Sequence, residues 1–548
     1  MSDNTPVSPG ELSPGEQGPG SVDPTLVDRR TDKRRTQVRW IAAGSAVAVL
    51  AVAGVVVANI AGKGDSATAN PGDAVTTAAG SDPAAVVTVG LTLEPSNLDI
   101  RATSGIALDQ VLIDNVYQGL VRRSADGTIS PSLATSWKAS DDALTYTFTL
   151  AEGATFSNGD KLTSADVLWS INDLRTQNRS GAEDLAAVSA VTAPDEKTVV
   201  VALTKPDPSL LWALSGRAGL VLDPDATNDR GTTAVGSGPY VLDGWKQGDS
   251  ITLTRNGHYW GKDTAQVAKV VFRYIKDTNA AVNAFNAGDL DVLAPVSALQ
   301  SSQVTTSGVK LVTGAAADKF VLAFNNSKAP FTDIRVRQAI RYAIDHEALV
   351  KARGGVDALL GGPIAPVDPG YEDLTSLYPY NPTKAKELLA AAGFGGGLKL
   401  TLTIPSFYGN TFPDLLTSQL AQVGITLTVN SVEFSAWLQD VYTNKNYDLS
   451  IVDHADSHDF GAWAKPTYYF GYNNPEVQDL YAQSQVAATA EASATLLAKA
   501  AKIVSQDAAA DWLTNFRTVT AVRDRISGFP TDNINARLDL THLTAAAS

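Results

Sequence analysis

The second half of the sequence alternates between helix-like and strand-like segments, and this alternation constrains the fold more than any other feature of the chain. The expected order is helix 332–352, helix 381–393, strand 398–404, helix 412–424, strand 425–432, helix 433–444 and strand 447–453. Strands that are separated by helices of about 10–15 residues are joined by crossovers, which favour a parallel sheet. We therefore expect an α/β fold with a parallel sheet in this half.

The first half contains more strand-like segments than helical ones. Alternating apolar residues predict strands at 85–93, 143–150, 197–204 and 266–275. Residues 162–174 are expected to form a helix that Thr163 caps, with Asp166 completing a variant of the capping box. A second short helix is expected to end near Gly288.

Length and composition limit the classes of protein that this chain can represent. A chain of 548 residues is too long for one ordinary core and indicates two or three lobes. The net charge of −15 argues against a nucleic-acid partner, because phosphate binding requires a basic face. The absence of cysteine excludes disulfides, thiolate zinc sites and a cysteine nucleophile.

The N-terminus contains a segment that is long enough to span a bilayer. Residues 1–39 are expected to be a disordered cytoplasmic tail, and the uncharged apolar run 40–62 follows a group of six basic residues. Positive charge stays on the cytoplasmic side, so the rest of the chain is expected outside the membrane, after a linker at 63–84. The apolar run is either a retained transmembrane anchor or a signal peptide cleaved near Ala67 and Ala69.

A cluster of acids and histidines follows the strand at 447–453, where the sequence reads DHADSHD. Ligands of open α/β sheets bind beyond the carboxyl ends of the strands, so this cluster is a candidate binding site. Its members are Asp453, His454, Asp456, His458 and Asp459. Three interpretations stay open: an aspartate contacts an amine or another polar ligand, His454, His458 and Asp456 bind a metal ion, or the side chains only stabilise the loop.

Several other side chains are candidates because they follow expected strands or lie next to this loop. Glu94 and Asn97 follow the first strand, and Tyr408 lies in a loop between a strand and a helix. Trp463 and Tyr468 belong to an aromatic run after the acidic cluster, where packing within a lobe is the alternative.

Six segments, found in the expected order, resemble one protein family. They are DNVYQGLVRR, PSLATSWKASDDALTYTFTL, FSNGDKLTSADVLWSI, GSGPY, FNNSKAPFTDIRVRQAIRYAIDHEALV and NPTKAKELLAAAGF. Across about residues 86–548 the chain resembles the family-5 extracytoplasmic solute-binding proteins of bacterial ABC importers, the dipeptide-, oligopeptide- and nickel-binding group.

The resemblance implies a two-lobed clamshell of the type II periplasmic-binding-protein fold with an additional domain. Lobe I would combine residues 86–113, 234–312 and 516–548. The additional domain would comprise residues 114–233, and lobe II residues 313–515. The chain would cross between the lobes near residues 312 and 516, and these crossings would act as hinges.

The resemblance also implies a function. The chain would act as a monomer, without a cofactor, and would capture a peptide or a similar small polar solute between its lobes. It would then deliver the solute to permease subunits that cytoplasmic ATPases drive. In the peptide-binding relatives a carboxylate of the corresponding loop contacts the amino group of the peptide, and Asp456 or Asp459 matches it best. Tyr117 matches a segment that lies near the ligand in relatives.

Two departures keep other functions open. The loop sequence DHADSHDFGAW differs from the family's usual Gly-Asp-x-x-Asp-Pro pattern, so an oligosaccharide or a nickel-type metal chelate is an alternative ligand. A membrane-tethered sensor or a hydrolase is a further alternative. The sequence contains no G-x-S-x-G, H-E-x-x-H or G-x-x-x-x-G-K-[ST] motif, which argues against an enzyme.

Overall fold

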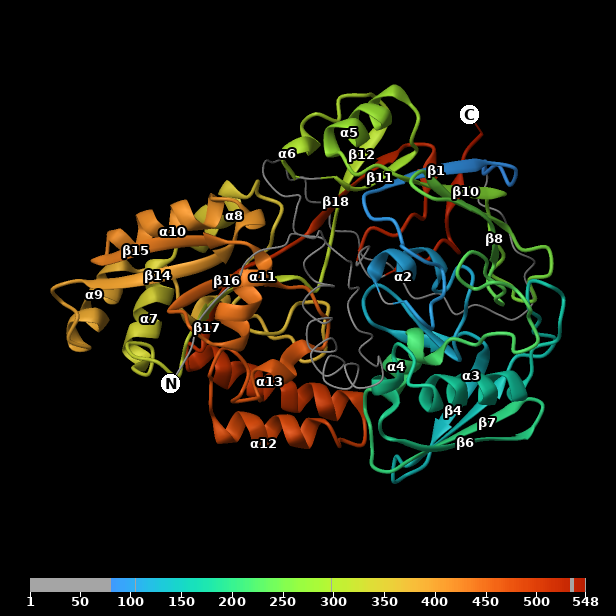
Figure 1. Ribbon diagram of the computed structural model, residues 1–548, viewed down its shortest axis with the longest axis horizontal. Coiled ribbons are helices and arrows are strands. Elements are labelled where there is room, and N and C mark those ends of the chain that lie inside the picture. Colours follow the sequence, from blue (N-terminus) through green and yellow to red (C-terminus); the bar gives the residue numbers. More distant parts are fainter. Residues whose placement is uncertain (1–79, 104, 297, 533–536, 548) are drawn as a thin grey trace, which may run out of the picture. The chain divides into compact units, whose positions relative to one another are not determined.

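The computed structural model describes residues 80–103, 105–296, 298–532 and 537–547 (Figure 1). The expected tail at 1–39 and the apolar run at 40–62 lie outside these residues. Among the helices that the structure describes, none combines the length and the hydrophobicity needed to cross a membrane.

The first large sheet has seven strands in the order β12-β18-β11-β1-β10-β9-β8. Strand β1 lies at its centre and pairs in parallel with β10 and β11, whereas the remaining pairs are antiparallel. The strands are β1 (Val86–Leu91), β8 (Tyr240–Lys246), β9 (Ser250–Arg255), β10 (Lys269–Tyr274), β11 (Val292–Val296), β12 (Val309–Gly314) and β18 (Thr518–Arg523). The sheet therefore combines three distant parts of the chain.

Alternation in the sequence explains the burial of this sheet. Val87, Val89 and Leu91 of β1 are buried in the core of the first sheet. Helix α2 (Ile106–Leu112) contributes Leu108 to the same core. Helix α5 (Thr278–Ala287) ends at the left-handed Gly288, as the sequence predicts, and α6 (Ala298–Ser301) follows β11.

A four-stranded antiparallel sheet, β4-β5-β7-β6, forms the centre of the segment 114–233. Its strands are β4 (Ala134–Ala139), β5 (Thr145–Leu150), β6 (Val188–Asp195) and β7 (Thr198–Leu203). Helix α3 (Ser164–Thr176) packs against them through Val167, Ile171 and Leu174. Thr163 and Asp166 form the predicted capping box of α3. The hairpin β2 (Val121–Arg123) and β3 (Ile129–Pro131) and the short helix α4 (Leu210–Leu214) complete this segment.

The sheet of the second half has five strands in the order β15-β14-β16-β13-β17. They are β13 (Lys319–Phe324), β14 (Leu398–Pro405), β15 (Ile425–Val432), β16 (Leu449–His454) and β17 (Ala510–Asn515). Strands β14, β15 and β16 are parallel, as expected, but β13 is antiparallel to both β16 and β17. The three strands expected from the sequence are thus parallel, but the sheet as a whole is mixed, because β13 runs opposite to the other four strands.

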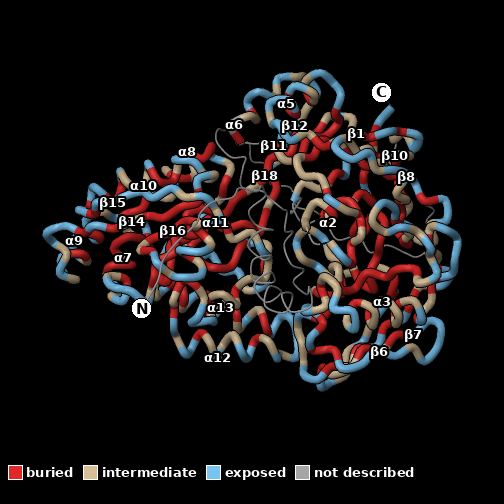
Figure 2. Tube along the Cα trace, in the orientation of Figure 1, coloured by how far each residue is buried: buried red, intermediate tan, exposed pale blue. Residues whose placement is uncertain are grey.

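Helices flank this sheet, and Figure 2 shows buried residues along its strands and both buried and exposed residues along the helices. They are α7 (Ile334–Ala343), α8 (His346–Ala352), α9 (Pro382–Ala391), α10 (Thr411–Ala421), α11 (Phe434–Trp437), α12 (Pro475–Ser484) and α13 (Ala490–Gln506). The single helix expected at 332–352 is wrong, because Ile344 adopts an extended conformation and Asp345 caps a new helix, α8.

The chain passes twice between the seven-stranded and the five-stranded sheet. The first passage, residues 315–318, joins β12 to β13, and the second, Phe516 and Arg517, joins β17 to β18. The exact boundaries of the two lobes and of the additional domain stay a prediction.

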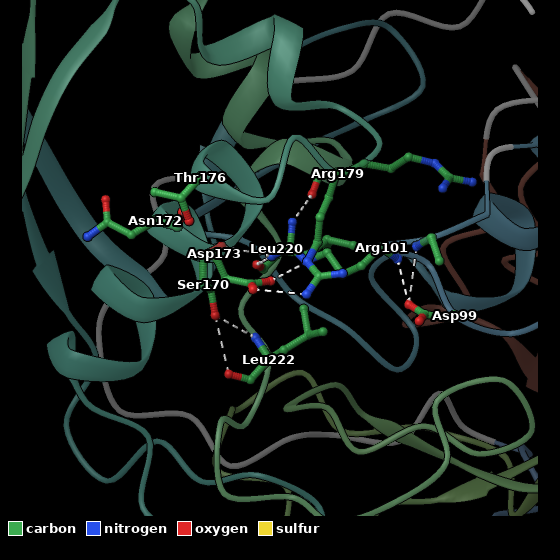
Figure 3. A network of polar contacts seen from close by, with 11 residues as sticks. Asp99, Arg101, Ser170, Asn172, Asp173, Thr176, Arg179, Leu220 and Leu222 are labelled. Carbon is green, nitrogen blue, oxygen red and sulfur yellow. Dashed lines mark hydrogen bonds and ion pairs between the residues drawn. The ribbon is translucent and has the colours of Figure 1, made fainter. Parts of the chain in front are cut away.

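Two arginines, Arg101 and Arg217, connect the segments that the sequence analysis assigns to lobe I and to the additional domain. Arg101 donates to the carbonyl oxygen of Leu220 at 2.6 Å, and Figure 3 shows its side chain pointing to that backbone. Arg217 forms an ion pair with Asp109 at 2.7 Å and donates to the carbonyl of Ile100 at 3.0 Å. These contacts cross the predicted boundary at residue 114 in both directions and hold the two segments together.

Candidate ligand-binding site

The acidic cluster lies at the carboxyl end of β16, which is the middle strand of the five-stranded sheet. A short 3₁₀ turn, Asp459–Ala462, follows four residues that have no regular structure. The loop therefore begins at the edge where the parallel strands β14 and β16 both end. Such an edge is where α/β proteins bind ligands.

Asp456 has the only carboxylate of this loop that is both exposed and without a partner among the described residues. The backbone carbonyl of Asp456 accepts a hydrogen bond from Lys319 Nζ at 3.1 Å, which holds the loop in place. Surrounding protein raises the pKa of Asp456 through desolvation, and Lys319 opposes this effect. The carboxylate is thus partly desolvated but still exposed, and it is available to a ligand.

Asp459, in contrast, forms an ion pair within the protein. Its Oδ1 lies 3.2 Å from Nζ of Lys319, whose side chain is 2% exposed. Burial raises the pKa of Asp459 to about 7, although the charge of Lys319 counteracts the shift. Burial also opposes the charge on Lys319, but the carboxylates of Asp459 and Asp368 outweigh it and raise the pKa of Lys319. This ion pair fixes the loop against the first residue of β13.

His454 is enclosed by aromatic rings and stays neutral. Its Nε2 lies 3.1 Å from the hydroxyl of Tyr469, and the two rings are nearly parallel at a centroid distance of 6.2 Å. Burial lowers the pKa of His454 to about 3. The ring therefore acts as a packed, uncharged member of the lobe.

His458 contacts the additional domain. It adopts a left-handed backbone conformation, with φ of 61°, and its ring centroid lies 3.9 Å from that of Trp212. The guanidinium carbon of Arg123 lies 3.7 Å from the same Trp212 ring. Nδ1 of His458 is 4.0 Å from Oδ1 of Asp368. His458 therefore links the loop of lobe II to Trp212.

Asp453 is buried within β16. Its backbone N–H donates to the hydroxyl of Tyr408 at 3.0 Å, while its Oδ1 has no hydrogen-bond partner among the described residues. Burial raises the pKa of Asp453 strongly, and the nearby Asp318 adds to the shift. Asp453 and Tyr408 thus lie together beneath the loop.

The described residues do not provide a set of ligands for the metal ion that the sequence left open at this loop. Within the described ranges, no group of three or more His, Asp or Glu side chains is placed to hold a metal ion. His454 is directed to Tyr469 and His458 to Trp212, so the two rings have different neighbours.

The remaining predicted site residues make internal contacts. Trp463 is buried and stacks on Phe470 at 4.1 Å, and Tyr468 is half-buried among aromatic neighbours. Tyr117 belongs to the core of the first sheet.

Glu94 and Asn97 are also engaged. Oε1 of Glu94 accepts hydrogen bonds from Trp245 Nε1 at 2.9 Å and from the backbone of Gly248 at 2.8 Å. Oδ1 of Asn97 accepts from the backbone of Asp99 at 2.7 Å. These contacts stabilise lobe I, and the structure does not bring either residue together with the acidic loop.

Three residues next to the loop are absent from the sequence-based candidates: Lys319, Asp368 and Trp212. A sequence signal exists for Lys319, because it begins the otherwise apolar strand KFVLAF, where an unpaired charge would be costly. Asp368 and Trp212 lie in segments without a distinctive pattern, and only the tertiary structure brings them to the loop.

A cavity of about 480 Å³ extends beside the loop, between the additional domain and lobe II. The additional domain contributes the turn of the β2–β3 hairpin and the start of α4, and lobe II contributes the loop after β16 together with α12 and α13. Residues of its wall include Ile129, Trp212, Asp368, His458, Phe460 and Tyr481.

Comparisons with known proteins agree with this fold. The sequence profile described as "Bacterial extracellular solute-binding proteins, family 5 Middle" matches residues 128–476. The glutathione-binding protein GsiB of Escherichia coli O1:K1 / APEC is 28% identical over 454 residues, which cover 77% of this chain and 87% of that protein.

Two solved structures have a similar fold. The ABC transporter substrate binding protein CtaP from Listeria monocytogenes matches with a TM-score of 0.76 and 23% identity, covering 85% of this chain and 100% of that chain. The periplasmic binding protein DppA from Helicobacter pylori, in complex with the peptide STSA, matches with a TM-score of 0.66 and 23% identity, covering 85% and 98%.

The fold is the two-lobed α/β fold of periplasmic binding proteins. Because the family profile matches more than half of the chain, the chain belongs to the bacterial extracellular solute-binding proteins of family 5. The family and the binding role predicted from the sequence are thereby confirmed. The relatives are transport binding proteins rather than enzymes.

Proposed function

We propose that this chain captures a peptide, or a similar small solute with a free amino group, and that the carboxylate of Asp456 binds this group. The solute is held between lobe I and lobe II and is delivered unchanged to the permease of an ABC importer. The availability of Asp456 carries the proposal, because the neighbouring Asp459 is neutralised by Lys319 and Asp453 is enclosed in β16.

The chemistry of known ligands supports this choice. GsiB is named for glutathione, and the DppA structure contains the peptide STSA. Both ligands carry a free amino group, which is positively charged at neutral pH. A partly desolvated carboxylate is a suitable partner for this group, since hydrogen bonds between charged groups are shorter and stronger than neutral ones.

Capture is a conformational event and requires no chemical step. The two chain passages, at 315–318 and at Phe516–Arg517, are proposed to serve as hinges between the lobes, with the boundaries predicted above. A ligand that contacts both lobes shifts the population toward a closed state by its differential affinity for that state. The protein acts in this scheme as a monomer and without a cofactor.

The proposal includes a location outside the cytoplasmic membrane. The family is described as extracellular, which agrees with the charge pattern before residues 40–62. Retention of this segment would tether the protein close to its permease and raise its effective concentration there.

A substitution of Asp456 tests the proposed amine contact. Asp456→Asn should weaken binding of a small peptide such as trialanine roughly tenfold to a hundredfold, since a hydrogen bond to a charged group contributes about 1.5–3 kcal/mol. Isothermal titration calorimetry measures the affinity. The melting temperature should stay unchanged, because no described side chain depends on this carboxylate.

Asp373→Asn is the matched control, because Asp373 is exposed and, among the described residues, its carboxylate accepts hydrogen bonds from Thr375 alone. N-acetylated trialanine should bind the unmodified protein as weakly as trialanine binds the Asp456→Asn variant. Equal affinities of the unmodified protein and the Asp456→Asn variant for trialanine would refute the amine contact.

A further inference from the structure

The cavity between the additional domain and lobe II has the size of a ligand pocket. Its volume of about 480 Å³ falls within the range of about 300–1,000 Å³ that is typical of small-molecule sites. Most of its wall is apolar or aromatic, with Leu211 and Trp212 on one side and Phe460 and Leu497 on the other. Such a wall favours the apolar part of a ligand.

The charged groups of the wall all have the same sign. Asp368, Asp459 and Glu491 line the cavity, whereas none of the described lining residues is a lysine or an arginine. Burial lowers the pKa of His458, so this ring does not add positive charge at neutral pH. Lys319 compensates the charge of Asp459, so Asp368 and Glu491 are the carboxylates of the wall that favour a cation over an anion.

Asp368 provides an independent indication of a ligand. Its side chain is 5% exposed, and its Oδ1 accepts a hydrogen bond from the hydroxyl of Ser457. Its Oδ2 has no hydrogen-bond partner among the residues that the structure describes, although Asp368 forms part of the cavity wall. The charge of Lys319 acts on this carboxylate, and a cation in the cavity would add a direct partner for its free oxygen.

The cavity lies next to the proposed amine site. His458 and Asp459 belong to both the loop and the wall, and Asp456 precedes His458 by two residues. Asp456 is not part of the wall itself, and the proposal below requires one ligand to reach from its carboxylate into the cavity.

We propose that this cavity is a charge-selective pocket, in which Asp368 binds the cationic end of an otherwise apolar side chain, as in lysine. The transported solute would then be a basic peptide or a comparable diamine, and acidic solutes would be disfavoured. The inference rests on the proposed function, because it concerns a second contact of the same solute.

Calorimetry with three tripeptides tests the pocket. Ala-Lys-Ala should bind at least tenfold more tightly than Ala-norleucine-Ala, which has the same apolar stem without the charge, and also more tightly than the acidic tripeptide glutathione. Asp368→Asn should abolish the preference for lysine and leave the affinity for the norleucine peptide unchanged.

Two further variants control for indirect effects. Glu491→Lys reverses the charge of an exposed wall residue in the first turn of α13, and it should also reduce the preference for lysine. Glu387→Gln removes an exposed carboxylate that pairs with Lys384 at 3.3 Å outside the cavity, and it should preserve the preference.

The outcomes separate the pocket from the proposed function. Three results would refute the proposed charge-selective pocket. They are equal binding of the lysine and norleucine peptides, tighter binding of glutathione than of the lysine peptide, and a lysine preference that survives Asp368→Asn. If these peptides still lose affinity on N-acetylation, the proposed amine contact stands. If none of the three tripeptides binds, the proposed function fails and the pocket fails with it.

Discussion

At the scale of single residues, the loop after β16 contains aspartates whose surroundings assign them different roles. Asp456 is accessible and unpaired, Asp459 is bound to Lys319, and Asp453 is enclosed by β16 and Tyr408. Residue type alone therefore does not identify the ligand contact in this cluster. The partner of each carboxylate decides whether it can bind a solute.

The ion pair between Lys319 and Asp459 predicts a large effect on stability. Lys319→Met should lower the free energy of unfolding by about 3–5 kcal/mol, because it leaves the buried Asp459 without its cation. Urea denaturation measures this loss. Lys328→Met is the matched control, since the exposed pair of Lys328 and Asp448 should contribute at most about 1 kcal/mol. Losses of the same size in both variants would contradict the assigned role of Lys319.

The burial of His454 predicts a dependence of stability on pH. Its folded-state pKa, about 3, lies below the unfolded value of 6.5, so its contribution is complete above pH 6.5 and is lost as pH falls. The loss should reach about 2 kcal/mol between pH 7 and pH 5. Urea denaturation across this range should show it as a difference between the unmodified protein and His454→Gln.

The comparison with His454→Gln is needed because Asp459 has the opposite effect on stability. Its pKa in the folded protein is raised to about 7, so its contribution to stability increases as pH falls over the same range. Parallel pH curves for the two proteins would show that His454 does not titrate in this way.

At the scale of elements, periodicity predicts local structure well and strand direction poorly. The alternating residues of β1, the capping box of α3 and the strand before the acidic loop all follow from local sequence. The break between α7 and α8 does not, because the apolar stripe continues through Ile344, which is buried although its backbone is extended. The direction of β13 also cannot be predicted from local sequence, because the chain enters this strand from the seven-stranded sheet.

The same distinction applies to the candidate site. The position of the loop follows from the rule for strand ends in α/β sheets. The choice of Asp456 over Asp459 requires the contact with Lys319, which lies 140 positions away in the sequence. The pairing of His458 with Trp212 brings together two regions that no local pattern connects.

At the scale of the whole molecule, the contacts of the additional domain differ between its two neighbours. Arginine side chains join it to lobe I, including Arg537, which pairs with Asp114 at 2.7 Å and donates to the carbonyl of Ser215 at 2.9 Å. Toward lobe II it presents the contact between Trp212 and His458 and the cavity described above. We therefore expect the additional domain to move together with lobe I when a ligand is captured.

The most direct measurement is a crystal structure of the protein with bound trialanine. The amino nitrogen of the peptide should lie within about 3 Å of a carboxylate oxygen of Asp456. The peptide should contact both lobes and remain chemically intact. A peptide bound elsewhere, with its amino group far from Asp456 and the loop after β16 left open to solvent, would contradict the proposed capture of an amine-bearing solute.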